Sequence, residues 1–390
     1  MSVRISYEKI IDTLKDFWEK KCGFNNISAD LKNYALLTSP YFPNTFTPSI
    51  GAGILDFKIS NILANSSWDT DFNEELFYVY GVNFRAFDIG SVPYSNDRLS
   101  LFHSMACFHI KNPNIETNVH EKIIKDTYNF LVDILGLSPK EIVVSIFSGG
   151  HIGGVDFGSD KESLRVWNEI GLEENNIIKS STRLNYLMSM VEQYGNPGLL
   201  PFLGPRSEIF YRIKSESGLK LIEIATMQYI LGLRDKDNIN KIIKMPTVYS
   251  VAFGVERLSM IMNGFNNIFE IDILDPLMKR VYSAIEPNIQ GSKTNVKEII
   301  KPEAQVLADH IRAYIFLILH INKSGGKIAL SDGKKSTINK LKKEIKQACQ
   351  KLNINPHKIV IEIINVVNEV YISFRPEMKD MNISELIEGF

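Results

Sequence analysis

The stretch TVYSVAFGVERLSMIMNG, Thr247–Gly264, contains two predicted elements with no loop between them. Its first part, Thr247–Phe253, is rich in β-branched and aromatic residues, which favour a strand. The second part, VERLSMIMNG after Gly254, has apolar residues at helical spacing. A strand that runs directly into a helix predicts mixed α+β structure in this part of the chain.

The segments before this stretch predict further strands and helices. The strand pattern is strongest in LKLIEIATMQYI, Leu219–Ile230, and EIVVSIF, Glu141–Phe147, is a candidate buried strand followed by the glycine-rich SGGHIGG. From about Tyr34 to Ile110, short aromatic-rich runs separated by Pro, Gly and Asn predict strands and loops. Helical spacing predicts three helices, namely one capped by Ser6, one over Val119–Leu135 that ends at Gly136, and one over Lys161–Ile170.

Beyond Phe265 the sequence becomes almost wholly helical. Pro302 suits the first turn of one helix, and Lys358–Tyr371 predicts either another helix or a long strand. The helix between them has a regular apolar stripe made of Ile338, Leu341, Ile345, Ala348 and Leu352. We therefore expect a mixed α+β domain over residues 1–265 and a helical domain over residues 266–390.

Composition excludes several classes of protein. The chain has 390 residues, 44% of them hydrophobic, and a formal net charge of -1, which argues against a uniformly basic nucleic-acid-binding surface. Its cysteines, Cys22, Cys107 and Cys349, are far apart and suit a reducing compartment. The N-terminus lacks a continuous apolar stretch, and the most apolar run, Ala313–Ile321, is too short to span a bilayer. We expect a cytoplasmic protein that does not act in a membrane, and the oligomeric state stays open.

Short motifs along the chain resemble, in the same order, those of the alanyl-tRNA synthetases, which are class II aminoacyl-tRNA synthetases. Each match is weak alone, but their shared order and spacing make chance an unsatisfactory explanation. The matching segments are FTPSIGAGILDFK (46–58), NFRAF (83–87), FHSM (102–105), LGPRSEIFY (203–211), TMQY (226–229), AFGVERL (252–258) and LADHIRAYIFLI (307–318). The resemblance implies an α+β fold with a class II synthetase-type antiparallel sheet flanked by helices, followed by a mostly helical C-terminal domain.

The resemblance also implies a reaction, the ATP- and Mg²⁺-dependent activation of an amino acid as its adenylate and its transfer to tRNA. Arg85 matches the arginine that binds the α-phosphate and the substrate carboxylate, and Arg257 matches the arginine that binds the γ-phosphate. A planar guanidinium binds phosphate through two hydrogen bonds, which suits a reaction catalysed by positioning and electrostatics. The alternative is that both are surface arginines in ordinary ion pairs.

Four further residues are candidates for the ATP site. Arg98 lies where it could reach ATP or the acceptor, and Phe102 or His103 lies where the family stacks an aromatic ring on adenine, with His103 the closer match. Glu208 matches a carboxylate near the phosphates and is a candidate Mg²⁺ ligand, because Mg²⁺ prefers oxygen ligands. Each also has a plain structural alternative, as a solvated arginine, a core residue or an edge-strand glutamate.

The departures from the family cluster in the expected substrate pocket, which by resemblance also includes Gly254. Ser250 stands where the family has an Asp that binds the substrate ammonium, Ala252 replaces a Gly, and Leu187 replaces a Trp. Glu223 replaces an Asn, and we expect it to bind the substrate ammonium in place of the family's Asp. A salt bridge from Glu223 to Lys220 or to an arginine is the alternative, since a carboxylate on a strand needs a cation or strong donors. We expect that alanine is not the best substrate.

Full-length members of the family carry an editing domain whose metal ligands have no counterpart here. We therefore expect either a role outside translation or editing by another protein, because a hydrophobic pocket separates substrates that differ by one methylene by only ~1–3 kcal/mol.

The acceptor stays open among three alternatives: tRNA, a carrier-protein thiol or small-molecule amine, or no acceptor, in a non-catalytic protein that binds RNA or an amino acid. A lysine-rich helix face favours RNA, although a solvated face explains the same charges. Its predicted RNA-binding residues are Lys335, Lys342, Lys343 and Lys346.

Overall fold

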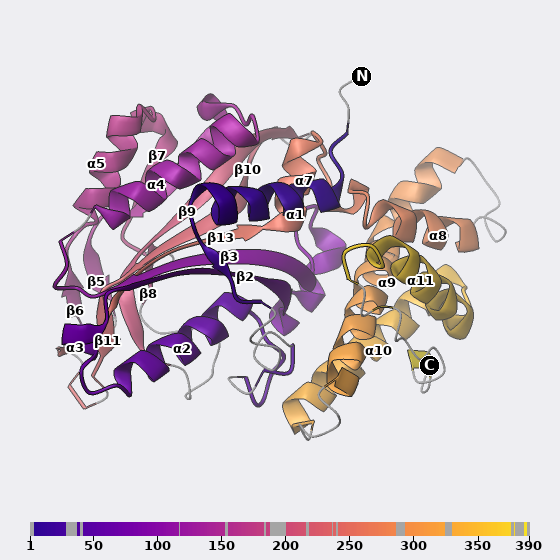
Figure 1. Cartoon of the computed structure of the whole chain (residues 1–390). Helices are drawn as coiled ribbons and strands as arrows, with labels where there is room; N and C mark the ends of the chain where they lie inside the picture. Colours follow the sequence, from indigo (N-terminus) through magenta and orange to yellow (C-terminus); the bar gives the residue numbers. More distant parts are fainter. Residues whose placement is uncertain are drawn as a thin grey trace.

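The computed structural model describes residues 4–28, 37–39, 42–116, 118–152, 155–182, 185–187, 200–215, 218–235, 237–238, 241–285, 293–323, 330–375, 378 and 386–387. A large sheet lies between two layers of helices, and a group of C-terminal helices packs at one end of it (Figure 1). The helices are α1 (Tyr7–Asp16), α2 (Ile50–Leu63), α3 (Trp68–Asp71), α4 (Val119–Asn129), α5 (Lys161–Ile170), α7 (Val255–Met262), α8 (Asp275–Ile285), α9 (Lys293–Lys323), α10 (Asp332–Leu352) and α11 (Pro356–Tyr371).

The central sheet has the strand order β1-β2-β3-β13-β10-β9-β11-β12, with β4 and β8 also paired to β9, and β7 paired to β4. Strands β2, β3, β13, β10 and β9 pair antiparallel with one another, whereas the β1–β2 and β4–β7 pairs are parallel. The strands of this sheet are β1 (Asn25–Asn26), β2 (Glu74–Phe84), β3 (Leu101–Lys111), β4 (Ile142–Phe147), β7 (Ile177–Ser180), β8 (Tyr186–Leu187), β9 (Phe202–Ser215), β10 (Gly218–Ile230), β11 (Gly232–Arg234), β12 (Ile242–Ile243) and β13 (Thr247–Gly254). A separate hairpin pairs β5 (Gly150–Ile152) with β6 (Val155–Phe157). The predicted fold class, α+β with an antiparallel sheet flanked by helices and a helical C-terminal part, is confirmed.

The two faces of the sheet are covered by different helices. Helices α1, α4 and α7 lie over one face, and α2 lies over the other (Figure 1). The N-terminus of α2 is fixed by Asn83 of β2, whose Oδ1 accepts the Ile50 N–H at 2.7 Å, and by Ser49, whose Oγ accepts the Ala52 N–H. Gly51 allows α2 to approach β3 closely, because a Cβ there would come within 2.9 Å of the Ala106 Cβ.

Helix α2 corrects one sequence prediction. The pattern from about Tyr34 to Ile110 predicts only strands and loops, yet 14 of these residues form α2. All-round apolar character hides the helical period, because α2 is buried along its first turns between the sheet and the rest of the core. Residues 34–36 and 40–41 of this region lie outside the described residues.

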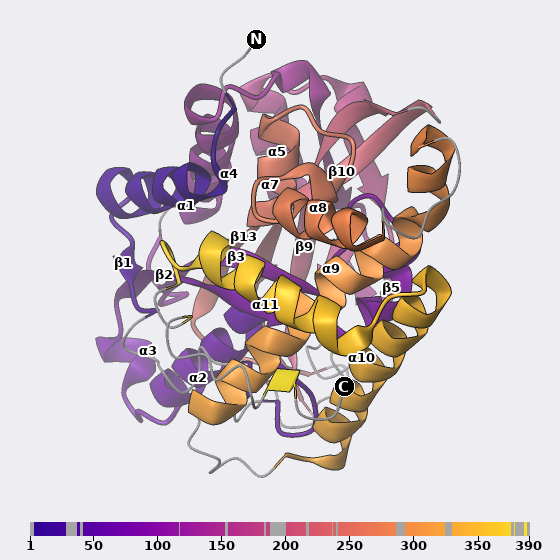
Figure 2. The ribbon, with the colours of Figure 1, turned by 90° about the vertical axis from the view of Figure 1, so that its right-hand side faces the viewer.

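The helices after Phe265 gather beside the ends of β2 and β3, where α11 crosses α9 (Figure 2). The apolar stripe predicted on α10 is confirmed, since all five of its side chains are buried. The segment Lys358–Tyr371 is helical, as part of α11. Pro302 does not begin a helix as predicted, because it lies inside α9. The division into domains at residue 265 stays a prediction.

Among the described residues, one helix, Glu298–Lys323, is long and apolar enough to cross a membrane, but 89% of its most apolar window is buried inside the protein. Such burial is typical of a core helix.

Candidate active site

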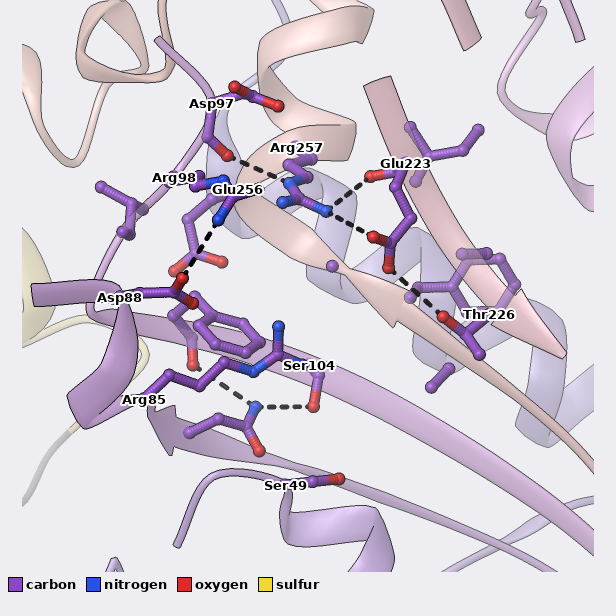
Figure 3. A pocket seen from close by; sticks show the side chains of 18 of the residues that line it. Ser49, Arg85, Asp88, Asp97, Arg98, Ser104, Glu223, Thr226, Glu256 and Arg257 are labelled. Carbon is purple, nitrogen blue, oxygen red and sulfur yellow. Dashed lines mark hydrogen bonds and ion pairs between the residues drawn. The ribbon is translucent and has the colours of Figure 1, made fainter. Parts of the chain in front are cut away.

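An open cavity of about 240 Å³, here called the outer cavity, lies at the end of the sheet where β2 ends and β3 begins (Figure 3). Three arginines line it from three different segments. Arg85 directly follows β2, Arg98 precedes β3, and Arg257 lies in the first turn of α7. The antiparallel register brings them together, because Phe84 pairs with Leu101, and Gly254 at the end of β13 pairs with Ser104.

Arg257 is held by three oxygen atoms in the outer cavity. Its Nε donates to the Asp97 carbonyl at 3.1 Å, and its Nη1 donates to the Glu223 carbonyl at 3.1 Å. The same Nη1 lies 3.3 Å from Oε2 of the Glu223 carboxylate. The guanidinium therefore points into the cavity in one orientation, close to the positive N-terminal end of α7, which favours an anion.

Arg85 and Arg98 are held less tightly. The Arg85 guanidinium lies 4.6 Å from the centre of the Phe102 ring, and its Nε donates to the Pro48 carbonyl at 3.5 Å. Arg98 Nη1 lies 3.4 Å from Asp88 Oδ1, and 54% of the Arg98 side chain is exposed. Because the Arg98 side chain is largely exposed, a bound phosphate can displace its contact with Asp88.

The carboxylates of the outer cavity differ in their surroundings. Burial raises the pKa of Asp88 in spite of Arg85 and Arg98. Burial also opposes ionisation of Asp97 and Glu223, but Lys220 at 2.7 Å lowers the pKa of Asp97, and Arg257 and Arg85 lower that of Glu223. Both groups are therefore ionised and compensate part of the arginine charge.

Glu208 lies next to the outer cavity rather than on its wall. Its carboxylate is paired with Arg206 at 2.5 Å and accepts the hydroxyl hydrogen of Thr226, which lines the cavity. Thr226 Oγ1 also lies 3.3 Å from Glu223 Oε1, so two carboxylates converge on one hydroxyl. Burial, with repulsion from Glu223, raises the pKa of Glu208 to about 7. In the described part of the chain, no three His, Cys, Asp or Glu side chains are placed to hold a metal ion by themselves.

A second, smaller cavity of about 50 Å³, here called the inner cavity, lies between α2 and the sheet. It shares Ser49, Ser104, Thr226 and Ala252 with the outer cavity and is therefore its continuation. Its remaining lining residues are Gly51, Ala52, Ala106, Phe108, Gln228 and Ser250. The charged groups thus lie at one end of this continuous space and the neutral groups at the other.

Most predicted site residues come together in these two cavities. The outer cavity contains Arg85, Arg98, Arg257, Phe102, Glu223, Ala252 and Gly254. Ser250 lines the inner cavity, and Ala252 lines both. Leu187 lies in β8 and pairs with Gly204, but its side chain lies outside the described residues.

His103 is not in either cavity, which corrects the expectation that it could stack on a nucleotide base. Because side chains alternate along a strand, Phe102 and Ser104 face the cavity and His103 faces the opposite side of the sheet. There it is fully buried, with its Nδ1 at 2.9 Å from Glu256 and its ring near Tyr7 and Tyr371. Of the two aromatic candidates, only Phe102 is available to a ligand.

Glu223 lies too far from Ser250 to bind the substrate ammonium where the family's Asp would bind it, which corrects the expectation from the sequence. Ser250 pairs with Gln228, and Glu223 lies five residues earlier on β10, which is roughly 15 Å at the usual strand rise. Glu223 forms its salt bridge with Arg257, whereas Lys220 pairs with Asp97. Glu223 therefore does not occupy the place of the family's Asp at position 250, and any ammonium that it binds lies in the outer cavity.

Sequence reasoning missed several residues of the site. Asp88 and Asp97 lie in the loop between the second-motif segments, and their proximity to Arg85 and Arg98 was an available signal. Gln228 follows Thr226 by two residues and therefore faces the same side of β10. Ser49, which brings α2 to the cavity, gave no signal because α2 was not predicted.

The predicted RNA-binding lysines lie on α10, away from both cavities. Lys335, Lys343 and Lys346 are exposed, and Lys342 is half-buried with its Nζ over the Tyr314 ring. Three of them, Lys342, Lys343 and Lys346, line one surface hollow with Asn339, Gln347 and Gln350.

Residues 52–388 match a family model described as "tRNA synthetases class II (A)". Among curated proteins, the chain is 27% identical over 210 residues to an alanine–tRNA ligase of Prochlorococcus marinus, covering 51% of this chain and 21% of that protein. It is 27% identical over 213 residues to an alanine–tRNA ligase of Thermotoga maritima, covering 51% of this chain and 22% of that protein. The matches thus span between a fifth and a quarter of the length of these relatives.

The solved structures give a distant likeness. The crystal structure of a pyrrolysyl-tRNA synthetase from Desulfitobacterium hafniense is 13% identical, with a TM-score of 0.35, and the match covers 69% of this chain and 74% of that one.

Proposed function

We propose that this chain, which belongs to the class II tRNA synthetase family, is an ATP-dependent ligase that activates a small amino acid, alanine or an analogue, and transfers it to tRNA. The observation that carries the proposal is the convergence of Arg85, Arg98 and Arg257 with Phe102 on one cavity. Three guanidinium groups in one half-open space suit a polyphosphate, and an aromatic ring beside them suits a nucleotide base.

The chemistry assigns a role to each of these groups. A carboxylate oxygen of the amino acid attacks the α-phosphorus of ATP, the new P–O bond forms, and the bond to pyrophosphate breaks. Arg85, near the carboxylate, stabilises charge at the α-phosphorus, while Arg257 holds the leaving pyrophosphate. In the second step a tRNA hydroxyl attacks the acyl carbon, and AMP leaves with the electrons of the acyl–oxygen bond.

The residues next to Thr226 fit a magnesium ion. Glu208 and Glu223 direct two carboxylates at one hydroxyl, and a cation bound to Glu208 and to phosphate oxygens would relieve their repulsion. Mg²⁺ would supply charge neutralisation on the β- and γ-phosphates. Glu208 would then fix the position of the triphosphate against Arg257.

We also propose that residues 1–265 form the adenylation domain and residues 266–390 a helical domain that holds the tRNA acceptor stem. An enzyme that charges tRNA in this way would work in the cytoplasm. The exposed lysines on α10 support an RNA contact, since each phosphate that a lysine neutralises releases counterions. Recognition by such a face would depend on shape and backbone and would weaken as salt rises.

Two measurements test the two steps separately. Pyrophosphate exchange over a panel of amino and carboxylic acids tests adenylate formation, and acylation of total tRNA at low salt tests transfer. Replacing Lys342, Lys343 and Lys346 together by Ala should weaken transfer at least fivefold and leave exchange unchanged. A matched control removes the same charge from exposed lysines elsewhere, by replacing Lys9, Lys20 and Lys21 with Ala.

Each outcome selects one alternative. Exchange without any binding or acylation of tRNA would replace tRNA by a carrier-protein thiol or a small-molecule amine. No exchange with any acid would leave a non-catalytic protein that binds RNA or an amino acid. Equal losses of transfer in the two triple variants would remove the assigned role of α10.

A further inference from the structure

The inner cavity is small and adjoins the groups proposed to bind the reacting carboxylate. It shares four lining residues with the outer cavity and continues from it between α2 and the sheet. Because one water-sized group needs roughly 10–15 Å³, a cavity of about 50 Å³ admits about three to five non-hydrogen atoms. A short side chain of the activated acid fits this space.

Two polar side chains at the inner end of this cavity have no hydrogen-bond partner in the described part of the chain. They are Gln228 of β10 and Ser250 of β13, which are direct cross-strand partners and therefore lie side by side on the same face. An amide and a hydroxyl each donate and accept hydrogen bonds. Together they can bind a neutral group that also does both.

The hydroxyl groups that lie nearer the outer cavity are available mainly as hydrogen-bond donors. Ser104 Oγ already accepts the Asn83 Nδ2 amide at 2.7 Å, and Ser49 Oγ already accepts the Ala52 N–H. Their own hydroxyl hydrogens are thus available to a ligand oxygen. Thr226 uses its hydrogen on Glu208.

No charged side chain lines the inner cavity among the described residues. A ligand ammonium would lose its water there without a carboxylate to compensate its charge. A hydrocarbon group would instead leave Gln228 and Ser250 buried without partners, which a binding site penalises strongly.

We infer that the inner cavity selects an acid whose short side chain ends in a neutral hydrogen-bonding group, a hydroxyl or a carboxamide. The inference rests on the proposed function, since it takes the reacting carboxylate to lie beside Arg85 in the outer cavity. Gln228 and Ser250 are then specificity-determining residues, and alanine is not the preferred substrate.

Matched amino acids of equal length test this inference by pyrophosphate exchange at pH 7. Homoserine, norvaline and 2,4-diaminobutyrate differ only in a terminal hydroxyl, methyl or ammonium group, and serine and 2-aminobutyrate form a shorter pair. The hydroxyl compound in at least one set should exceed its methyl counterpart at least tenfold in kcat/KM, and 2,4-diaminobutyrate should be the poorest substrate. A methyl compound that equals its hydroxyl partner in both sets, or a preference for the diamine, overturns the inference.

Substitutions at the inner end of the cavity provide a second readout. Gln228→Leu keeps a similar size but removes the amide, so the preference for hydroxyl over methyl should fall at least tenfold. Ser250→Asp and Ser250→Asn have nearly the same shape and differ in charge. Only Ser250→Asp should raise the activity with 2,4-diaminobutyrate relative to homoserine, and equal ratios in both variants would contradict the assignment.

The exchange results distinguish a failure of the proposed ligase function from a failure of the assignment of the inner cavity. If no acid supports exchange, the proposed function fails, and the inference fails with it. If exchange occurs but only with apolar or cationic side chains, the ligase activity stands and the assignment of the inner cavity fails. Thermal melting of each variant identifies losses that come from misfolding.

Discussion

The outer cavity and a buried junction between the sheet and the C-terminal helices are built from the same residue types. In the outer cavity, Arg257 is paired with Glu223. In the buried junction, Arg312 of α9 lies beside Asp309, and its guanidinium donates to the Leu101 carbonyl and to the Tyr371 hydroxyl at 2.8 Å. The complete junction consists of Ser100, Leu101, Asp309, His310, Arg312, Glu344 and Tyr371.

The two regions differ in the solvent exposure of their paired charged side chains. The Arg257 and Glu223 side chains are 23% and 38% exposed, whereas those of Arg312 and Asp309 are fully buried. A ligand can open a partly exposed pair at a lower cost than a fully buried one, because a buried charge that loses its partner is strongly unfavourable. The comparison supports the proposal that the outer cavity binds a ligand, whereas the buried junction is structural.

The largest expected effect is on stability and lies in the buried junction. Replacing Arg312 by Met should lower the free energy of unfolding by about 3–5 kcal/mol, because Asp309 would lose one of its two buried cationic partners and the Tyr371 hydroxyl would lose its donor. Urea unfolding measures this loss. Arg280→Met on the exposed side of α8 is the control and should change stability by no more than about 0.5 kcal/mol. Equal stability of Arg312→Met and the wild type would show that this arginine of the buried junction does not stabilise the fold.

The next effect is on catalysis and lies in the outer cavity. Arg257→Ala should reduce pyrophosphate exchange by about a hundredfold or more, equivalent to ~3–4 kcal/mol, because it removes a preorganised donor from the leaving group. Its effect on unfolding should stay within about 1 kcal/mol, since its ion pair is partly exposed. Near-normal exchange in Arg257→Ala, or a loss as large in Arg280→Ala, would refute the assigned role.

Local sequence patterns predicted several features of the outer cavity and of the C-terminal helices. The junction of Thr247–Phe253 with a helix and the buried stripe of α10 follow from spacing and residue type, which depend on neighbours in the chain, and the motif arginines follow from the family resemblance. The function of an arginine depends on its burial, and burial comes from long-range packing. Residue type and local spacing alone therefore do not separate Arg312 from Arg257, and only the family resemblance assigned Arg257 to the site.

The errors have the same origin. The prediction for His103 is wrong because side chains alternate along β3. Its neighbours Phe102 and Ser104 face the outer cavity, and His103 is buried on the other face of the sheet. Glu223 cannot substitute for a carboxylate at Ser250, because the spacing between two antiparallel strands depends on a register that the sequence does not display. The inner cavity was not predicted, since it needs both that register and helix α2.

A substitution of Glu223 in the outer cavity should have a smaller effect than one of Arg257. Glu223→Gln keeps the side-chain shape but removes the charge paired with Arg257. We expect a rise of about tenfold, or ~1.4 kcal/mol, in the KM for the amino acid, little change in the KM for ATP, and a stability change under about 1 kcal/mol. Exchange kinetics with each substrate varied in turn measure both constants. An unchanged KM for the amino acid would remove Glu223 from the binding of the substrate ammonium.

The smallest effect concerns pH and returns to the buried junction. His310 lies between Asp309 and Glu344, at 3.1 and 3.2 Å. Burial alone would lower its pKa, but hydrogen bonds to both carboxylates raise the pKa of His310 above its usual value. The folded protein therefore holds this proton more tightly than the unfolded chain. Its contribution to stability is complete below a pH of about 6.5 and is lost as the pH rises through the folded pKa.

The variant His310→Gln isolates this contribution because glutamine does not titrate. The difference in unfolding free energy between wild type and His310→Gln, measured in urea from about pH 6 to pH 9, should decrease as the pH rises. Burial lowers the pKa of His103 and His120, which act in the opposite direction, but both are present in the two proteins and cancel in the difference. A difference that is flat or grows with pH would mean that His310 is neutral in the folded protein. The buried junction would then be held by Arg312 and Asp309 without a charged histidine.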